Sequence, residues 1–163
     1  MLFRSGDESQ DVARLCQKHH KDYVTIDNRF DSVIAKGARA IVCSREFLDR
    51  EYPGVEYQAL LKQYQSNCSG LIIFTFGSRP VLFASAGKAI ETFQPYQITV
   101  VDTLAAGDTF RAGVVYGILE GWPDLEVVRF ASATATVSCL CFPSVYEPPT
   151  LAEITELMNS RPD

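Results

Sequence analysis

The chain has 163 residues, a length that fits one domain, and its 47% hydrophobic and 21% charged residues are typical of a globular protein. This composition excludes an intrinsically disordered chain, and the net charge of −5 argues against a general nucleic-acid binder. Charged residues interrupt every apolar run before it reaches the length that crosses a membrane.

Helix and strand patterns alternate along the first half of the chain. Apolar residues at helical spacing and short β-branched runs predict, in order, a helix over 11–21, a strand over 23–27, a helix over 30–36, a strand over 40–43, a helix over 55–65 and a strand over 71–76. The last strand is continuously apolar, which suits a strand covered on both faces.

The second half begins with β signals and ends with helical ones. Strands over 81–84, 89–93 and 97–101 are predicted to form a meander after the turn at 77–80. A helix over 107–120 follows, with Gly121 placed to end it. Two more helices are expected, one over 122–140 and one from Thr150, where Glu153 completes a capping box.

This alternation predicts an α/β fold over residues 1–163, a three-layer α/β/α sandwich with a mostly parallel sheet in a single domain. In such sheets ligands bind beyond the carboxyl ends of the strands. We therefore expect Asp27, Ser44, the segment 75–77 and the segment 102–108 to lie along one edge of the sheet.

The segment 102–110 carries the strongest chemical signal. A predicted strand ends at Val101, three small residues follow at 105–107, and a helix begins with Asp108 in its first turn. Free N–H groups at a helix N-terminus attract anions, and small residues let a phosphate approach the backbone closely. A carboxylate at such a place makes sense as a base that takes a proton from a hydroxyl attacking the phosphate.

A purely structural role explains the same residues. An acid in the first turn of a helix complements the helix dipole, and a glycine before a helix is common. On the residues alone, Asp108 is therefore either a base or an ordinary helix-start acid.

The segment also resembles a family signature. Ribokinase-like sugar kinases of the PfkB family carry Asp-Thr-x-Gly/Ala-Ala-Gly-Asp-x-Phe, which stands here as Asp102-Thr103-Leu104-Ala105-Ala106-Gly107-Asp108-Thr109-Phe110. The resemblance implies that Asp108 is the catalytic base and that the N–H groups of Ala105, Ala106, Gly107 and Asp108 form an anion hole for the transferring phosphoryl group. It implies that Asp102 shapes the loop and, in some relatives, helps to hold a monovalent cation such as K⁺.

Three other segments resemble the family, and two of them have a plain alternative. Thr75-Phe76-Gly77 resembles the Thr-x-Gly that lies against the nucleotide phosphates, although a strand-ending glycine is equally ordinary. Asp27-Asn28-Arg29 resembles an acid-and-arginine loop. Ser44-Arg45-Glu46 stands where many members carry Asn-x-x-Glu, tied to magnesium and phosphate positioning. Ser44 takes the place of the Asn, but Glu46 comes one residue early and equally suits a solvated first helical turn.

The resemblance covers residues 23–157 and only the later part of the family fold. We find no Gly-Gly-x-x-x-Asn-x-Ala segment and no lid, so the N-terminal sugar-binding strands are expected to be missing. Because catalysis requires the acceptor hydroxyl to be positioned, we expect weak nucleotide binding and little or no turnover from this chain alone. An uncovered sheet edge or apolar face would favour a homodimer.

The leading hypothesis is an ATP-dependent sugar kinase that uses ATP and Mg²⁺ to phosphorylate a sugar hydroxyl. The alternatives are a non-catalytic nucleotide-binding or interaction module with the same fold, and an α/β domain whose match is accidental. ATP and a sugar acceptor are the expected partners, without nucleic acid or membrane. Five cysteines and no visible signal peptide predict reduced thiols in a cytoplasmic protein, and neither Cys139 with Cys141 nor His19 with His20 has zinc spacing. The acceptor sugar is not identified by these residues.

Overall fold

The computed structural model describes residues 2–3, 7–144 and 146–160 of the chain. The described residues fall into two compact units, Met1–Thr92 and Phe93–Asp163, and the single domain over 1–163 stays a prediction. All five cysteines are free thiols. Among the helices of the described residues, none is long and apolar enough to cross a membrane.

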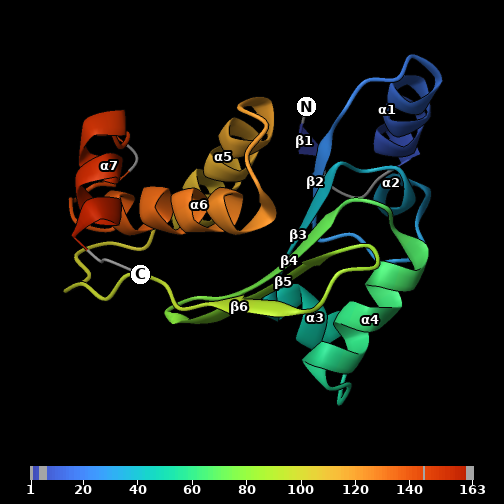
Figure 1. Ribbon diagram of the computed structural model, residues 1–163, viewed down its shortest axis with the longest axis horizontal. Helices are drawn as coiled ribbons and strands as arrows, with labels where there is room; N and C mark the ends of the chain where they lie inside the picture. Colours follow the sequence, from blue (N-terminus) through green and yellow to red (C-terminus); the bar gives the residue numbers. More distant parts are fainter. Residues whose placement is uncertain (1, 4–6, 145, 161–163) are drawn as a thin grey trace. The chain divides into compact units, whose positions relative to one another are not determined.

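In the described part of the first unit, six strands form one sheet whose order follows the chain. They are β1 (Leu2–Phe3), β2 (Val24–Ile26), β3 (Ala40–Ser44), β4 (Leu71–Phe76), β5 (Arg79–Ser85) and β6 (Glu91–Phe93). The first four strands are parallel, and β5 turns antiparallel to β4. The sequence predicts β2, β3 and β4 in a mostly parallel sheet, whereas β1 has no counterpart among the predicted strands. Figure 1 shows the strands side by side in this order. The carboxyl ends of β2, β3 and β4 therefore share one edge.

The helices of the first unit are α1 (Asp7–Lys18), α2 (Val33–Lys36), α3 (Arg45–Glu51) and α4 (Tyr57–Asn67). Side chains cap three of them: Ser32 at α2, Ser44 at α3 and Glu56 at α4 each accept a hydrogen bond from a backbone N–H of the first turn. These caps satisfy amide groups that a helix start otherwise leaves unpaired, which explains why the helices begin where they do.

The core of the first unit lies between these helices and one face of the sheet. Because side chains alternate along a strand, every second residue of the sheet points to this core. The cluster joins sheet residues Ile41, Cys43, Ile72, Phe74, Phe76, Leu82 and Ala84 to helix residues that include Ile34, Phe47, Leu48, Leu60, Leu61 and Tyr64. The core therefore fixes the strands whose carboxyl ends carry several of the predicted site residues.

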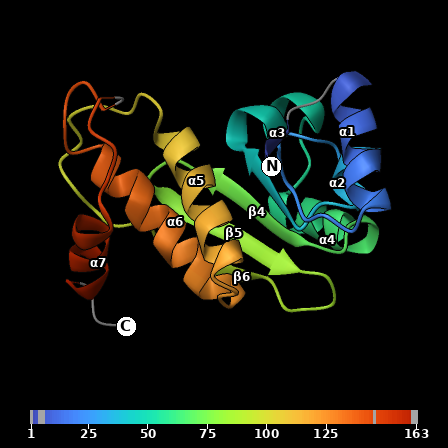
Figure 2. The same ribbon diagram turned by 90° about the horizontal axis from the view of Figure 1, so that it is seen from above.

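The second unit is helical in its described residues, with α5 (Ala106–Leu119), α6 (Asp124–Ser138) and α7 (Leu151–Asn159). Figure 2 shows α5 and α6 side by side. Glycine makes this contact close, because a Cβ added at Gly113 would lie 2.7 Å from the Cα of Ala131. Thr150 and Glu153 form the predicted capping box at α7. Gly117 of α5 likewise lies close to Val127 of α6.

Several predicted bounds need correction. Residues 97–101 are not a strand: Val100 and Val101 are exposed, and the N–H of Val101 donates to the carbonyl of Cys139, at the end of α6. Their β-branched side chains favour a strand, but a strand needs a partner edge, which this segment does not use. The first helix starts at Asp7 rather than at 11, α2 starts at Val33 rather than at 30, and α3 has no counterpart among the predicted elements.

Candidate active site

The start of α5 is held in an unusual backbone conformation. Ala105 is the residue that precedes the first turn, and its φ of 62° and ψ of 4° lie in the left-handed region. No side chain caps this helix. A left-handed alanine costs roughly 1 kcal/mol, and such strain persists where the surrounding structure requires it, often at functional sites. The predicted helix follows the small residues as expected, but the predicted strand before them is absent from the described residues 97–101.

The four amide groups predicted to form an anion hole are not equivalent. The N–H of Ala106 donates to the carbonyl of Thr103 at 3.2 Å, and the N–H of Asp108 donates to the carbonyl of Ala105 at 2.9 Å. Within the described part of the chain, the N–H groups of Ala105 and Gly107 have no hydrogen-bond partner. The helix start therefore offers an anion two unengaged donors, reinforced by the helix dipole.

Asp108 lies in the first turn of α5, as predicted, and its side chain is 67% exposed. Its Oδ1 accepts a hydrogen bond from Nη1 of Arg111, one turn later, at 2.9 Å. Its Oδ2 has no partner among the described residues. The second carboxylate oxygen is thus available to a hydroxyl group that comes from outside the chain.

Asp102 ties two loops of the second unit together. Its Oδ1 accepts from the N–H of Leu104 at 2.9 Å, and its Oδ2 accepts from the N–H of Ser144 at 3.2 Å. The hydroxyl of Ser144 in turn donates to the carbonyl of Leu104. The hydrogen bonds from Leu104 and then Ser144 hold the pKa of Asp102 below its usual value. These contacts suit the loop-shaping role implied for Asp102.

At the sheet edge of the first unit, Asp27, Ser44 and Thr75 come together as predicted. Oδ1 of Asp27 accepts from the N–H of Ser44 at 2.8 Å and from its hydroxyl at 3.1 Å. Ser44 pairs with Thr75 in the register of β3 and β4. Gly77, with φ of 66°, opens the turn into β5. Because the segment 102–108 belongs to the second unit, its place at this edge stays a prediction.

The residues suggested for cations do not form a preformed site. Glu46 is exposed and lies 3.7 Å from Arg45. In the described ranges, no three His, Cys, Asp or Glu side chains gather in a way that could hold a metal ion. Both oxygens of Asp102 already accept amide hydrogen bonds. The described residues alone therefore do not fit a Mg²⁺ or K⁺ cage, and no chemical step is derived through such an ion.

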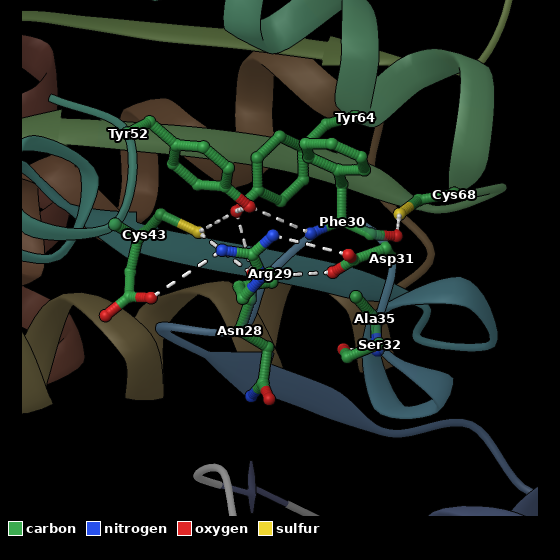
Figure 3. A network of polar contacts seen from close by, with 11 residues as sticks. Asn28, Arg29, Phe30, Asp31, Ser32, Ala35, Cys43, Tyr52, Tyr64 and Cys68 are labelled. Atoms are coloured by element: carbon green, nitrogen blue, oxygen red, sulfur yellow. Dashed lines mark hydrogen bonds and ion pairs between the residues drawn. The ribbon is translucent and has the colours of Figure 1, made fainter. Parts of the chain in front are cut away.

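A network of tyrosines under the loop 28–31 is a feature that sequence reasoning missed (Figure 3). The hydroxyl of Tyr64 donates to the carbonyl of Asn28 at 2.8 Å, and the hydroxyl of Tyr52 accepts from the N–H of Phe30 at 3.3 Å. Burial raises the pKa of Tyr64, and it raises the pKa of the adjoining Cys43 thiol to about 12. The spacing of Leu60, Leu61 and Tyr64 on α4 could have placed Tyr64 in the core, where a buried hydroxyl needs a partner.

Beside this loop, the first unit has a pocket of about 190 Å³ lined in part by Asp27, Arg29 and Glu51. The guanidinium of Arg29 lies 3.2 Å from Asp31, 3.9 Å from Glu51 and over the ring of Tyr52. The arginine of the predicted acid-and-arginine loop is therefore already held by two acids.

Taken by itself, the start of α5 can bind an anion and can place a carboxylate beside it. Enzymes that transfer phosphoryl groups combine backbone donors that hold phosphate with a carboxylate that activates a hydroxyl. The sequence of residues 51–150 matches the pfkB family of carbohydrate kinases. This match covers more than half of the chain, and the chain belongs to that family.

The chain also matches two relatives in sequence, each over part of the relative's length. The chain is 29% identical over 103 residues to a ribokinase of Lactococcus lactis, covering 63% of this chain and 33% of that one. It is 23% identical over 150 residues to a 5-dehydro-2-deoxygluconokinase of Clostridium botulinum, covering 87% and 42%. It thus spans less than half the length of these relatives.

Two solved structures resemble the chain closely in fold. One is Arabidopsis thaliana ribokinase complexed with ribose and ATP, with a TM-score of 0.81, 20% identity and coverage of 96% of this chain and 55% of that one. The other is a putative ribokinase II of E. coli in complex with ATP and Mg²⁺, with a TM-score of 0.81, 13% identity and coverage of 95% and 54%. The predicted ribokinase-like α/β fold is therefore confirmed.

Proposed function

We propose that this protein is an ATP-dependent sugar kinase and that this chain supplies the phosphate-handling side of its active site. The observation that carries the proposal is the start of α5. There, an exposed carboxylate at Asp108 adjoins unengaged N–H groups of Ala105 and Gly107, inside the segment that matches the family.

The proposed chemistry is the transfer of the γ-phosphoryl group of ATP to a sugar hydroxyl. Oδ2 of Asp108 accepts the proton of that hydroxyl as its oxygen attacks the γ-phosphorus, and the bond to the bridging oxygen breaks to release ADP. The N–H groups of Ala105 and Gly107 donate to the oxygens of the transferring group. Ala106 and Asp108 contribute by fixing the turn that aims these donors, since their own N–H groups close it.

Nucleotide contacts from Thr75, Gly77 and Ser44 are part of the same proposal. Support comes from their common edge in the first unit and from the ATP found in the structures of ribokinases with this fold. Mg²⁺ would enter the site bound to the ATP phosphates, because this ion usually takes few ligands from the protein. Glu46 is the residue that the family resemblance suggests as its protein ligand. The family resemblance also suggests that Asp102 helps to hold K⁺. Higher turnover in K⁺ than in Na⁺ would support this assignment.

We also propose that the residues that select the sugar lie outside this chain, because it spans less than half of its relatives. The chain alone would then bind ATP weakly and turn over little or no sugar. Rapid phosphorylation of a sugar by the purified 163-residue chain would contradict this. An uncovered sheet edge would also let two copies of the chain form a homodimer. Light scattering measures this, and a monomer at high concentration would contradict it.

The decisive experiment replaces Asp108 with Asn in the protein that carries this chain together with a sugar-binding segment. Turnover should fall by about 10² to 10⁴, the usual contribution of a general base, while ATP affinity is kept or improved. Asp124→Asn is the matched control, since Asp124 also lies in the first turn of a helix of this unit, and it should leave turnover unchanged.

The outcome also separates the two functional hypotheses. If Asp108→Asn retains full turnover, the assignment of the base is wrong. If the unaltered protein binds ATP but transfers no phosphoryl group to any sugar, the non-catalytic nucleotide-binding module is the better description.

A further inference from the structure

Arg111 on α5 has no role in the function proposed above. It lies one turn after Asp108, and its Nη1 donates to Oδ1 of that residue at 2.9 Å. The two side chains differ sharply in exposure, with Arg111 11% exposed and Asp108 67% exposed. The arginine is therefore the fixed member of the pair, and the carboxylate reaches back to it.

The guanidinium of Arg111 also lies beside the predicted anion hole. A Cβ added at Gly107 would meet the central guanidinium carbon of Arg111 at 4.0 Å. Gly107 is one of the two residues whose N–H groups have no partner in the described part of the chain. Arg111 thus places a full positive charge next to the backbone donors that a phosphate would approach.

The pairing of Arg111 with Asp108 reduces the repulsion between Asp108 and an incoming phosphate. An incoming triphosphate is repelled by the carboxylate of Asp108, and the repulsion grows as water leaves the site. A cation held against that carboxylate cancels most of its field at the helix start. The same hydrogen bond occupies Oδ1 and so leaves Oδ2 as the oxygen that faces an acceptor hydroxyl.

We propose that Arg111 is a positioning residue of the kinase site, which neutralises and orients Asp108 so that the ATP phosphates can approach the start of α5. The inference rests on the proposed kinase function and deepens it. Arg111 lies outside the matched signature, whose last residue is Phe110.

The plain alternative is a stabilising pair between residues three apart on a helix, which contributes only a few tenths of a kcal/mol in general. The chain offers a matched example. On α6, Nη1 of Arg129 donates to Oε1 of Glu126 at 3.1 Å, with 16% and 40% of the two side chains exposed. The spacing and the low exposure of the two arginines are alike, but this pair lies at a helix for which no phosphate site is proposed.

The experiment measures ATP and ADP binding by titration calorimetry with the 163-residue chain and with variants Arg111→Gln, Arg111→Lys, Asp108→Asn, Arg111→Gln/Asp108→Asn and Arg129→Gln. Arg111→Gln should weaken ATP binding about tenfold and ADP binding less, because an unpaired carboxylate then faces the phosphates. Arg111→Lys should recover most of the loss. The double variant should return close to the unaltered affinity, since both charges are gone.

A second readout comes from the protein that carries a sugar-binding segment. There, Arg111→Gln should raise KM for ATP and also lower kcat, whereas Asp108→Asn should lower kcat without raising KM. Melting temperatures of Arg111→Gln and Arg129→Gln serve to separate a loss of stability from a loss of binding, and Arg129→Gln should leave ATP binding and both kinetic constants unchanged.

Each result decides between the hypotheses. Equal ATP affinity in Arg111→Gln and the unaltered chain, or a double variant as weak as Arg111→Gln, would overturn the role of Arg111 and leave the proposed function standing. Failure of the protein that carries this chain together with a sugar-binding segment to bind ATP would overturn the proposed function, and with it the role of Arg111.

Discussion

Two regions of the molecule present an acid beside the backbone N–H groups at the start of a helix, and they use it differently. At the sheet edge of the first unit, the N–H and the hydroxyl of Ser44 both donate to Oδ1 of Asp27, and Ser44 in turn caps α3. At the start of α5 in the second unit, no side chain caps the helix, Ala105 is strained, and Asp108 is exposed.

The difference indicates that the first region stabilises the fold and that the second is available to a ligand. Polar groups that satisfy one another contribute to folding and have little left to offer a ligand. Strained backbone and unengaged donors cost stability, and natural proteins keep such features mainly at functional sites. The start of α5 is for this reason the better candidate for phosphoryl transfer, although both regions resemble family motifs.

The largest expected effect on stability comes from removing the acid at the sheet edge. Asp27→Ala should lower the free energy of unfolding of the first unit by about 3 kcal/mol, because two hydrogen bonds to a charged group are lost. A left-handed φ of 49° adds to the cost for alanine. Asp108→Ala should change stability by under about 0.5 kcal/mol, as an exposed ion pair contributes little. Urea unfolding followed by circular dichroism measures both.

Asp27→Asn is the control for this pair of variants. Asparagine tolerates the left-handed region and keeps one acceptor, so the loss should shrink to about 1 kcal/mol. Equal losses for Asp27→Ala and Asp108→Ala would break the contrast between the two regions.

Tyr64→Phe should have the next largest effect. The substitution keeps the ring in the core and removes the hydroxyl that donates to the carbonyl of Asn28. A buried carbonyl left without its donor costs about 1–3 kcal/mol. Tyr57→Phe is the control, because its hydroxyl bonds the exposed Asp49 and its loss should be within about 0.5 kcal/mol. Hydrogen exchange of the β3 and β4 amides would localise the loss to the first unit.

At the start of α5, by contrast, a substitution should increase the stability of the protein. Ala105→Gly should stabilise the second unit by about 0.5–1 kcal/mol, because glycine adopts a φ of 62° without strain. Ala106→Gly, at the next position and inside α5, should destabilise it by up to about 1 kcal/mol. Fluorescence of Trp122, the chain's single tryptophan, reports unfolding of this unit. A loss of stability in Ala105→Gly would show that the alanine is not strained.

Much of this could be predicted from the sequence, and the failures have physical causes. The apolar run of β4, the glycine-ended α5 and the capping box of α7 are local signals, and all three are confirmed. The strand expected over 97–101 is wrong because β-branched residues report a preference, whereas a strand also requires a neighbouring edge.

The residues of the candidate site could be proposed from the sequence, but most of its hydrogen bonds could not. The spacing of 102–110 identifies the helix start, yet the division of its amide groups into engaged and unengaged donors depends on the turn that Ala105 adopts. The pairing of Asp108 with Arg111 follows helical spacing and could have been found from the sequence. The hydrogen bonds of Tyr52 and Tyr64 could not have been found, since their partners are backbone amide and carbonyl groups far away in the chain.

Replacing Asp102 should have the smallest effect on stability. It tests the contrast between the two regions, because Asp102 belongs to the second unit but, like Asp27, accepts hydrogen bonds from backbone N–H groups. Its folded pKa is lowered, chiefly by the N–H of Leu104, so the stability it contributes is present above its unfolded pKa of about 4 and is lost as pH falls through the lower folded value. The difference in Trp122-monitored melting temperature between the unaltered chain and Asp102→Asn should therefore be constant near neutral pH, shrink as the pH falls below about 4, and vanish only below the lower folded pKa of Asp102. Carboxylates present in both proteins, such as Glu153, cancel in that difference. A difference in melting temperature that persists unchanged in acid would mean that the shape of Asp102 matters and its charge does not. Hydrogen bonds to an ionised carboxylate would then not be what holds this loop.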